Sequence, residues 1–441
     1  MKALGVDLGT TSIAAVVYDT AASRVAWCQS RPHGAELRTD DPLASLQDAE
    51  RMLALAERMV EMGLSEHADV AAIGVTGQMH GVVYLDAHLS PVSPLFTWQD
   101  RRGGQEAAPG ETFAERLSRL TGCRVHIGYG LATHAYLAHH GLVPEGASWL
   151  ATLPDAFAAR LVGLSRPRAH ASLAHSMGGF DLDQGAFVAG GLPEAGIDLS
   201  CLPEVVPDLH ILGEHRGIPV AVALGDHQAS FLGAVGVEEG GVLVNIGTGA
   251  QVSVCVRGRP ELSPGAELRP FVGDLRLAVA ATLAGGAAYA LVAAFFDRVV
   301  RMHGLEPTRS TYDVLDEAIA AWRQSGGGPF PRVRPTFFGS RSSDEDGARV
   351  ERWTAAGMAP EAFAWGVLSG VAEELHEGFC RLPPCGPDGP RALAGAGNAL
   401  RVNRHLRDAV EAVFGRPVQL APDPEEAAQG AARWAAMAVT A

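Results

Sequence analysis

The sequence contains almost no lysine, since Lys2 is the only one in 441 residues. P-loop proteins and protein kinases both hold phosphate with a lysine, and pyridoxal-phosphate enzymes form a Schiff base with one. These three classes are therefore excluded. Lysine and arginine together number 35 against 50 aspartates and glutamates, which gives a net charge of −15. Because this charge repels a polyanion, we expect no nucleic-acid partner.

Cysteine is also sparse, and its spacing matches no metal site. The six cysteines are scattered without a C-x-x-C pair, and no second pair follows Cys380 and Cys385. This pattern argues against a disulfide framework or a zinc ribbon, and it predicts a reducing, cytoplasmic location.

Long apolar runs are nearly absent as well. The apolar stretch before Asp7 is too short for a secretory signal. The one long uncharged run, residues 277–296, is rich in alanine and is interrupted by Gly285-Gly286. We interpret it as a buried strand, a glycine turn and an alanine-rich helix that continues to Arg301. We therefore expect no membrane partner.

Strand and helix patterns alternate along the first half of the chain, which is typical of α/β folds. The stretches "ALGVDLG" and "IAAVVYD" predict a hairpin, and "DVAAIGVTG" and "GVVYLD" predict two further strands. Asp41-Pro42 predicts a helix start, because apolar residues from Leu46 to Val60 follow at helical spacing. The five prolines of residues 151–212 predict a loop-rich segment. A boundary near Val237 gives domains 1–237 and 238–441, with the last helix packing back on the first domain.

Two hairpins share one outline: "VDLGTTSIAAVVYD" from Val6 and "VNIGTGAQVSVCVRG" from Val244. A glycine followed by hydroxyls and free N–H groups binds phosphate oxygens well, and Asp7 could hold a magnesium ion through water. For one such hairpin alone, a plain strand-turn-strand connection is the favoured interpretation. The repeat suggests two similar domains that face each other across a cleft.

Three other features bear on function, and the first two have two interpretations each. Asp226 in "ALGDHQ" follows a strand, so its carboxylate is suited to accept a proton at a cleft floor, or to cap a helix. "HAYLAHH", from His134 to His140, is either a metal cluster or a solvated helix end. "GAGNAL" lacks the third glycine of a dinucleotide fingerprint, which disfavours that function.

Six motifs in order resemble the FGGY family of carbohydrate kinases: "DLGTTS", "TGQMHG", "TWQDRR", "ALGDHQASFLGAVG", "NIGTGAQVSV" and "LAGAGNALRVN". The resemblance extends from residue 5 to about residue 430. It implies two actin-like (ribonuclease H-like) α/β domains with a cleft between them. "TGQMHG" resembles ketose kinases, and "TWQD" with "GYGLATHAYL" is most similar to the sedoheptulokinase branch.

The resemblance also implies a role for each motif. It implies that Asp7 organises Mg²⁺ and that Asp226 is the catalytic base and contacts the sugar. The remaining residues are implied to bind sugar (Gln78, Met79, His80, Trp98 and Asp100), the transferred phosphoryl group (Thr10, Thr11 and Ser12), the inner phosphates (Gly247 and Thr248) and adenosine (Gly395, Ala396, Gly397 and Asn398). Ala396 departs from the three consecutive glycines usual in the family, and Gly249-Ala250 stands where hydroxyls are often found.

The predicted function is therefore ATP- and Mg²⁺-dependent phosphorylation of a ketose, with sedoheptulose as the first choice. Xylulose, another polyol or an aldonate is the alternative substrate. A non-catalytic ATP-binding module on the actin-like fold is the alternative from another class, but it leaves "TGQMHG", "TWQD" and Asp226 unexplained. The expected partner is a small sugar, and the expected state is a monomer or a homodimer.

Overall fold

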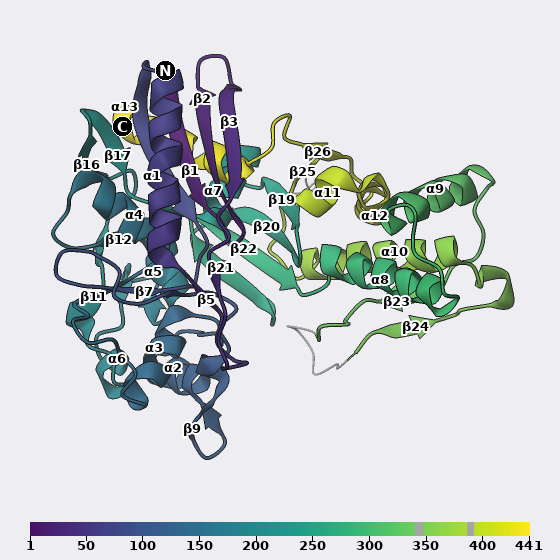
Figure 1. The fold of residues 1–441 in the computed structure, drawn as a ribbon, viewed down its shortest axis with the longest axis horizontal. Helices are drawn as coiled ribbons and strands as arrows, with labels where there is room; N and C mark the ends of the chain where they lie inside the picture. Colours follow the sequence, from purple (N-terminus) through teal and green to yellow (C-terminus); the bar gives the residue numbers. More distant parts are fainter. Residues whose placement is uncertain (340–346, 386–391) are drawn as a thin grey trace. The chain divides into compact units, whose positions relative to one another are not determined.

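The computed structural model describes residues 1–339, 347–385 and 392–441. It divides into two compact units. The first contains residues 1–236, 269–273 and 423–441, and the second contains residues 237–268 and 274–422. Each unit has its own central sheet (Figure 1).

The sheet of the first unit has the strand order β16-β17-β6-β1-β2-β3, with β18 paired to β6. β1, β2 and β3 are antiparallel neighbours, whereas β6 runs parallel to β1. The predicted hairpin is thus confirmed, with Asp7 opposite Ala14. The strands are β1 (Lys2–Leu8), β2 (Ser12–Asp19), β3 (Arg24–Pro32), β6 (Val70–Gly77), β16 (Ile211–His215), β17 (Ile218–Ala221) and β18 (Leu224–Gly225).

Helices cover both faces of this sheet. α1 (Ala49–Glu66) lies on one face, where a side chain at Gly63 would meet Leu4 of β1 (Figure 1). α13 (Glu426–Thr440) lies on the other face. A Cβ atom at Gly5 of β1 would lie 1.9 Å from a carbonyl oxygen of α13, and one at Gly74 of β6 would lie 1.8 Å from another. Glycine is therefore required at both strand positions, because only the bare backbone lets α13 approach so closely.

The sheet of the second unit has the order β21-β22-β20-β19-β25-β26, in which β22-β20-β19-β25-β26 corresponds to β3-β2-β1-β6-β17 of the first. β22, β20 and β19 are antiparallel neighbours, and β25 runs parallel to β19, as β6 does to β1. The likeness of the two hairpins thus extends to the central strands of both sheets, whereas β16, β18 and β21 have no counterpart. The strands are β19 (Val242–Ile246), β20 (Ala250–Arg257), β21 (Ala266–Pro270), β22 (Leu275–Thr282), β25 (Leu393–Ala396) and β26 (Val418–Leu420).

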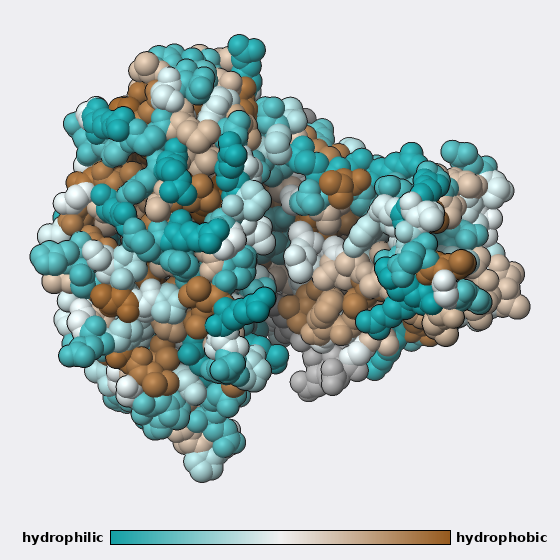
Figure 2. All heavy atoms as spheres, viewed as in Figure 1, coloured by the Kyte–Doolittle hydropathy of each residue, from teal (hydrophilic) through white to brown (hydrophobic). Residues whose placement is uncertain are grey.

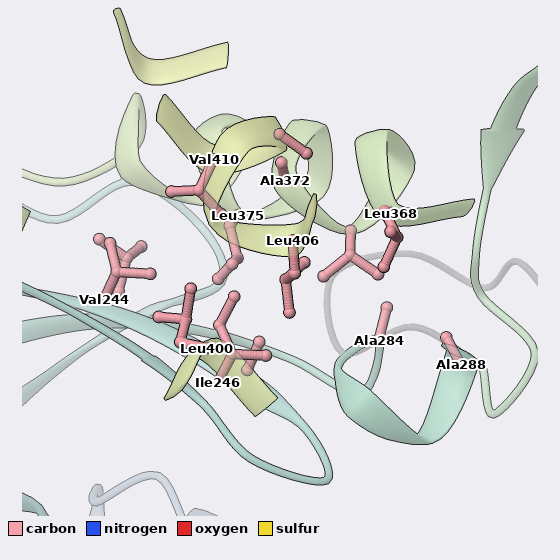
Figure 3. Close-up of a cluster of buried hydrophobic side chains, with 14 of the residues drawn as sticks. Val244, Ile246, Ala284, Ala288, Leu368, Ala372, Leu375, Leu400, Leu406 and Val410 are labelled. Carbon is pink, nitrogen blue, oxygen red and sulfur yellow. The ribbon is translucent and has the colours of Figure 1, made fainter. Parts of the chain in front are cut away.

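One apolar core holds the second unit together. Side chains from the β19 strand and from four helices converge in it (Figure 3), including Val244, Leu375 and Leu406. Full burial of a leucine side chain contributes roughly 1.5–3 kcal/mol. The helices are α8 (Gly286–Met302), α10 (Pro360–Phe379), α11 (Asn398–Val402) and α12 (Arg404–Phe414), while α9 (Thr311–Gln324) contributes Leu315 and Ile319.

The uncharged run 277–296 folds as predicted, into the end of β22 and most of α8. Within the described ranges, no helix combines the length and the apolar character needed to cross a bilayer. Hydrophilic residues cover most of the face in Figure 2, and apolar ones form small patches there.

Two local predictions were wrong. α1 begins at Ala49 and not after Asp41-Pro42, because Asp48 is its N-cap and accepts a hydrogen bond from the Arg51 N–H. Leu46 lies instead in the short strand β5 (Leu46–Gln47). The segment 151–212 is also more regular than its prolines suggest. It contains α4 (Leu153–Val162), in whose first turn Pro154 lies, and α5 (Ala171–Met177).

The histidines of "HAYLAHH" divide between core and surface. They lie on or next to α3 (Gly130–His139), where His139 and His140 are exposed. His134 is buried, its Nδ1 lies 2.6 Å from the Tyr84 hydroxyl, and burial lowers the pKa of its ring to about 4. The solvated-end interpretation is therefore wrong for His134. The part of the chain that the structure describes has no cluster of metal-ligating side chains there or elsewhere.

Candidate active site

The turn between β1 and β2 is fixed by side chains that arrive from elsewhere in the first unit. The Thr10 carbonyl accepts hydrogen bonds from Gln47 Nε2 at 2.8 Å and from His33 Nε2 at 2.9 Å. Trp98 Nε1 donates to Thr10 Oγ1 at 3.2 Å. Thr11 is exposed at the tip of the turn. The turn is thus held in one conformation with a hydroxyl facing solvent, as a preformed phosphate site requires.

Asp7 is a half-buried residue near the end of β1. Its Oδ1 is buried without a hydrogen-bond partner. Burial, followed by the negative charges of Asp226 and Glu425, raises the pKa of Asp7 well above its usual value. An orphaned carboxylate oxygen among like charges is a good position for a divalent cation, since oxygen is the ligand that Mg²⁺ prefers. The residues present therefore fit a magnesium ion.

Asp226 is the first residue of α7 (Asp226–Ala234). Burial raises the pKa of its carboxyl to about 6, against the opposing effects of the His227 backbone N–H and of the Arg269 charge. The N-cap of α7 is Gly225, and no side chain caps this helix end. The helix-capping interpretation of Asp226 is therefore wrong. Its carboxylate is available for chemistry and has a pKa close to the range of an effective general base.

The loop after β6 contributes Gln78, Met79 and His80. Gln78 Nε2 donates to Gln47 Oε1 at 3.0 Å, which links this loop to the β1–β2 turn. Met79 is buried next to α7, since a Cβ atom at Gly225 would lie 2.7 Å from its sulfur. His80 has a positive φ of 73°, its ring stacks on Tyr129 at 4.4 Å, and its Nδ1 lies 2.9 Å from the Ser176 carbonyl. A non-glycine residue with positive φ is uncommon and often marks a functional loop.

Trp98 and Asp100 follow the short strand β8 (Leu95–Phe96). Trp98 is 38% exposed, so its ring is accessible to a ligand. Asp100 has no exposed surface, and its Oδ2 accepts from Arg102 Nη2 at 2.6 Å and from the Ser45 N–H at 3.2 Å. A direct contact between Asp100 and a sugar stays a prediction. Its observed contacts fix the loop that presents Trp98.

In the second unit, the turn Gly247–Gly249 joins β19 and β20. The Gly247 carbonyl accepts from the Gly286 N–H at 2.8 Å, and the Thr248 carbonyl accepts from the Ala287 N–H at 3.0 Å. The start of α8 thus fixes this turn, as Gln47 and His33 fix the first. Thr248 is exposed, and a Cβ atom at Gly247 would have no neighbour within 4 Å. The turn therefore has room for a ligand close to its backbone.

The loop after β25 lies against the end of β19. Gly397 has a φ of +89°, and a Cβ atom there would lie 2.4 Å from the Ile246 carbonyl oxygen. Asn398, which starts α11, is exposed. Ala396 is 2% exposed, so its methyl group points into the unit rather than to solvent. The departure from three consecutive glycines therefore adds a buried methyl group here.

We expect Gly397→Ala to lower the melting temperature and to weaken ADP binding. A left-handed conformation costs a non-glycine residue ~1–3 kcal/mol, and the clash with Ile246 adds to this cost. Gly415→Ala is a matched control, because Gly415 has a φ of +62° and open space around its Cβ position. Differential scanning fluorimetry and calorimetric ADP titration would test this. Equal effects of the two variants would contradict the proposed role of this loop.

The structure also adds residues that motif reading missed. Gln47, His33, Ser176 and Arg269 each contact or influence a predicted site residue from a distant part of the sequence. Nothing in their local sequence distinguishes them. Only the fold brings them to the site.

The two repeated sheets define an actin-like, two-domain α/β protein. The structure of xylulose kinase from Rhodospirillum rubrum superposes with a TM-score of 0.83 at 23% identity, over 99% of this chain and 90% of that one. The profile of "FGGY family of carbohydrate kinases, N-terminal domain" matches residues 2–233, so the chain belongs to the FGGY family of carbohydrate kinases.

Individual relatives agree with this family. Sedoheptulokinase of Homo sapiens is 28% identical over 97% of this chain and 96% of its own length. Xylulose kinase of Streptomyces rubiginosus is 31% identical over 58% of this chain and 55% of its own. The family, the fold class and the enzyme class predicted from the sequence are thereby confirmed. The chain is a carbohydrate kinase.

Proposed function

We propose that this carbohydrate kinase transfers the γ-phosphoryl group of ATP to a hydroxyl of a ketose, with sedoheptulose as its preferred substrate. The observation that carries the proposal is the half-buried Asp226 carboxylate in the first turn of α7, where it caps no helix end and lies next to the loop that contains Met79. Similarity to sedoheptulokinase over nearly the whole chain supports a heptulose over a pentulose, since the similarity to xylulose kinase of Streptomyces rubiginosus covers little more than half of it.

Asp226 acts as the general base in this proposal. The sugar hydroxyl oxygen forms a bond to the γ-phosphorus, the bond from that phosphorus to the β,γ-bridging oxygen breaks, and ADP leaves. The hydroxyl proton passes to the Asp226 carboxylate. With a pKa of about 6, this group is mostly ionised at pH 7–8 and is still basic enough to accept the proton. Arg269 helps to keep it ionised.

Asp7 would hold Mg²⁺ through its carboxylate, whose Oδ1 has no hydrogen-bond partner, directly or through water. When bound, Mg²⁺ supplies positive charge that neutralises the phosphate oxygens. Thr10, Thr11 and Ser12 would contact the transferred phosphoryl group. Because Gln47 and His33 already fix the Thr10 carbonyl, little ordering of this turn is needed on binding.

The sugar would be held by Gln78, Met79, His80 and Trp98, with Asp100 fixing the Trp98 loop or contacting the sugar. Trp98 offers an accessible ring face, and Gln78 offers a buried, unpartnered Oε1 that a sugar hydroxyl can satisfy. On the second unit, Gly247 and Thr248 would bind the inner phosphates. The adenosine loop would be formed by Gly395, Ala396, Gly397 and Asn398.

ADP release against a panel of sugars tests the substrate. We expect Mg²⁺-dependent, sugar-stimulated ADP release, with kcat/KM highest for sedoheptulose and next highest for D-xylulose. Ribitol, glycerol and gluconate represent polyols and aldonates in the panel. Activity confined to glycerol, or ADP release that no sugar changes, would overturn the proposal. The second result would favour an ATP-binding module without a sugar acceptor.

A further inference from the structure

The short helix α5 contacts both the sugar loop and the start of α7 through two serines. Ser176 Oγ accepts a hydrogen bond from the His80 N–H at 3.2 Å. Ser172 Oγ accepts one from the Gly225 N–H at 3.0 Å. Gly225 directly precedes Asp226. Ser176, which contacts the sugar loop, and Ser172, which contacts the residue before the proposed base, therefore lie one helical turn apart on α5.

Ser172 belongs to a longer hydrogen-bonded chain. The His170 Nδ1 lies 2.8 Å from Ser172 Oγ and accepts from the Ser172 N–H at 3.1 Å. Because Nδ1 accepts, Nε2 carries the proton, and it lies 2.7 Å from Asp208 Oδ1. Asp208 Oδ2 in turn accepts from the Gly273 N–H. The Gly225 N–H thus donates to Ser172 Oγ, the Ser172 hydroxyl donates to His170 Nδ1, and His170 Nε2 donates to Asp208 Oδ1.

At its Asp208 end, this hydrogen-bonded chain contacts the segment 269–273, which contains Arg269. Gly273 closes residues 269–273, and within this segment the Pro270 carbonyl accepts from Gln228 Nε2 of α7 at 3.0 Å. Arg269 Nη1 lies 3.2 Å from His227 Nδ1, and its charge acts on Asp226. The network therefore holds two backbone segments that flank Asp226: the residue before it and the segment that brings a positive charge to it.

Asp, His and Ser in this order resemble a nucleophilic triad, but the burial excludes that role. His170 and Ser172 both have no exposed surface, and the edge of Trp434 covers the His170 ring at 5.2 Å. A substrate carbonyl or phosphorus cannot reach Ser172 Oγ, whose lone pair already receives the Gly225 N–H. Ser172 therefore has a structural role: it holds the Gly225 N–H, which directly precedes Asp226.

We propose that Ser172, His170 and Asp208 form a positioning network that fixes the Asp226 carboxylate for proton abstraction, while Ser176 on the same helix fixes His80 for sugar binding. This inference rests on the proposed function, in which Asp226 is the base. Loss of the Ser172 hydroxyl leaves the Gly225 N–H without its buried acceptor, so the start of α7 shifts to find another. Misplacement by about 1 Å at a reacting group can cost up to ~10²-fold in rate.

The test is a double-mutant cycle between Ser172→Ala and Asp226→Asn. We expect Ser172→Ala alone to lower kcat by about 10-fold, with a sugar KM within about 2-fold of wild type. In the Asp226→Asn background the same change should lower kcat by less than about 2-fold, because the group it positions is already absent. Ser172→Thr retains the hydroxyl and should restore part of the lost rate.

Three further variants separate positioning from general stability. Ser176→Ala should raise the sugar KM more than it lowers kcat. Asp208→Asn tests the partly exposed end of the network, so that the conclusion does not depend on a buried substitution; it should lower kcat by about 3-fold. Ser118→Ala is the matched control, because Ser118 Oγ accepts the Val125 N–H at 2.9 Å on α2 (Phe113–Thr121). It should lower the melting temperature and leave kcat unchanged.

A folded Ser172→Ala variant with wild-type kcat, or one whose loss is equal in both backgrounds, would overturn the positioning network. Near-normal turnover of Asp226→Asn would remove Asp226 as the base, and ADP release that no sugar changes would overturn the proposed function itself. Failure of the positioning network and failure of the proposed function are thus detected in different experiments.

Discussion

Asp226→Asn is expected to lower kcat by about 10²–10⁴-fold, the usual contribution of a general base. The amide has the shape of the carboxylate and can still hydrogen-bond a sugar hydroxyl, but it cannot accept the proton. Sugar and ATP affinities should therefore change far less than kcat. Steady-state kinetics with titration calorimetry for both ligands would measure this.

The pH profile gives a second readout of the same variant. Because the pKa of Asp226 is raised to about 6, kcat/KM of the wild type should fall as the pH drops through about 6. This limb should be missing in Asp226→Asn. Asp155→Asn is the control, since Asp155 at the start of α4 is buried and burial also raises its pKa well above the usual value. Near-normal turnover of Asp226→Asn, or equal losses in both variants, would contradict the role of Asp226.

Stability should move in the opposite direction to activity. A carboxyl whose pKa is raised on folding stabilises the fold at acid pH, and this contribution is lost as the pH rises through the folded-state pKa. For Asp226 the window is about pH 4–6. At pH 8 Asp226→Asn should therefore be more stable than wild type, by on the order of 1–3 kcal/mol, and below pH 4 the difference should vanish.

Asp7→Asn is expected to have the other large effect, a loss of about 10²–10³-fold in kcat together with a weaker response to Mg²⁺. A bound metal ion stabilises the charge of the transition state by several kcal/mol. Asp7 Oδ1, which is buried without a hydrogen-bond partner, is the oxygen that we expect to bind this ion. The variant should also unfold at a higher temperature in the absence of ligand, because it lacks the charge that burial and the neighbouring Asp226 and Glu425 disfavour. Wild-type activity with an unchanged Mg²⁺ requirement would exclude Asp7 as the metal ligand.

Most of the sheet architecture could be predicted from the sequence, for a physical reason. The strands β1, β6, β19 and β22 are mostly apolar and mostly buried segments, and this pattern is local. Helix starts were harder. Asp41-Pro42 has the pattern of a helix start, but Leu46 and Gln47 pair in a small sheet as β5, so the helix begins only after Asp48. The prolines of residues 151–212 predicted a loop, but Pro154 lies in the first turn of a helix, where proline is tolerated.

Some residues of the candidate site could also be predicted from the sequence, and others could not. Asp7, Gln78 and Asp226 lie at the ends of strands or helices that motifs mark, so the sequence could identify them as candidates. It left open whether Asp226 caps a helix, because that depends on which residue takes the N-cap position. The supports of the site were not predictable. Gln47 contacts Thr10 across 37 residues and Ser172 contacts Gly225 across 53, and such contacts exist only once the chain has folded.

One measurement tests the central claim most directly: ADP and sugar phosphate quantified in the same reaction of the purified protein with ATP, Mg²⁺ and sedoheptulose. We predict one sugar phosphate for each ADP, with both products falling together by at least about 10²-fold in Asp226→Asn. ADP formed without sugar phosphate, or equal product formation by wild type and Asp226→Asn, would contradict phosphoryl transfer to a sugar with Asp226 as the base.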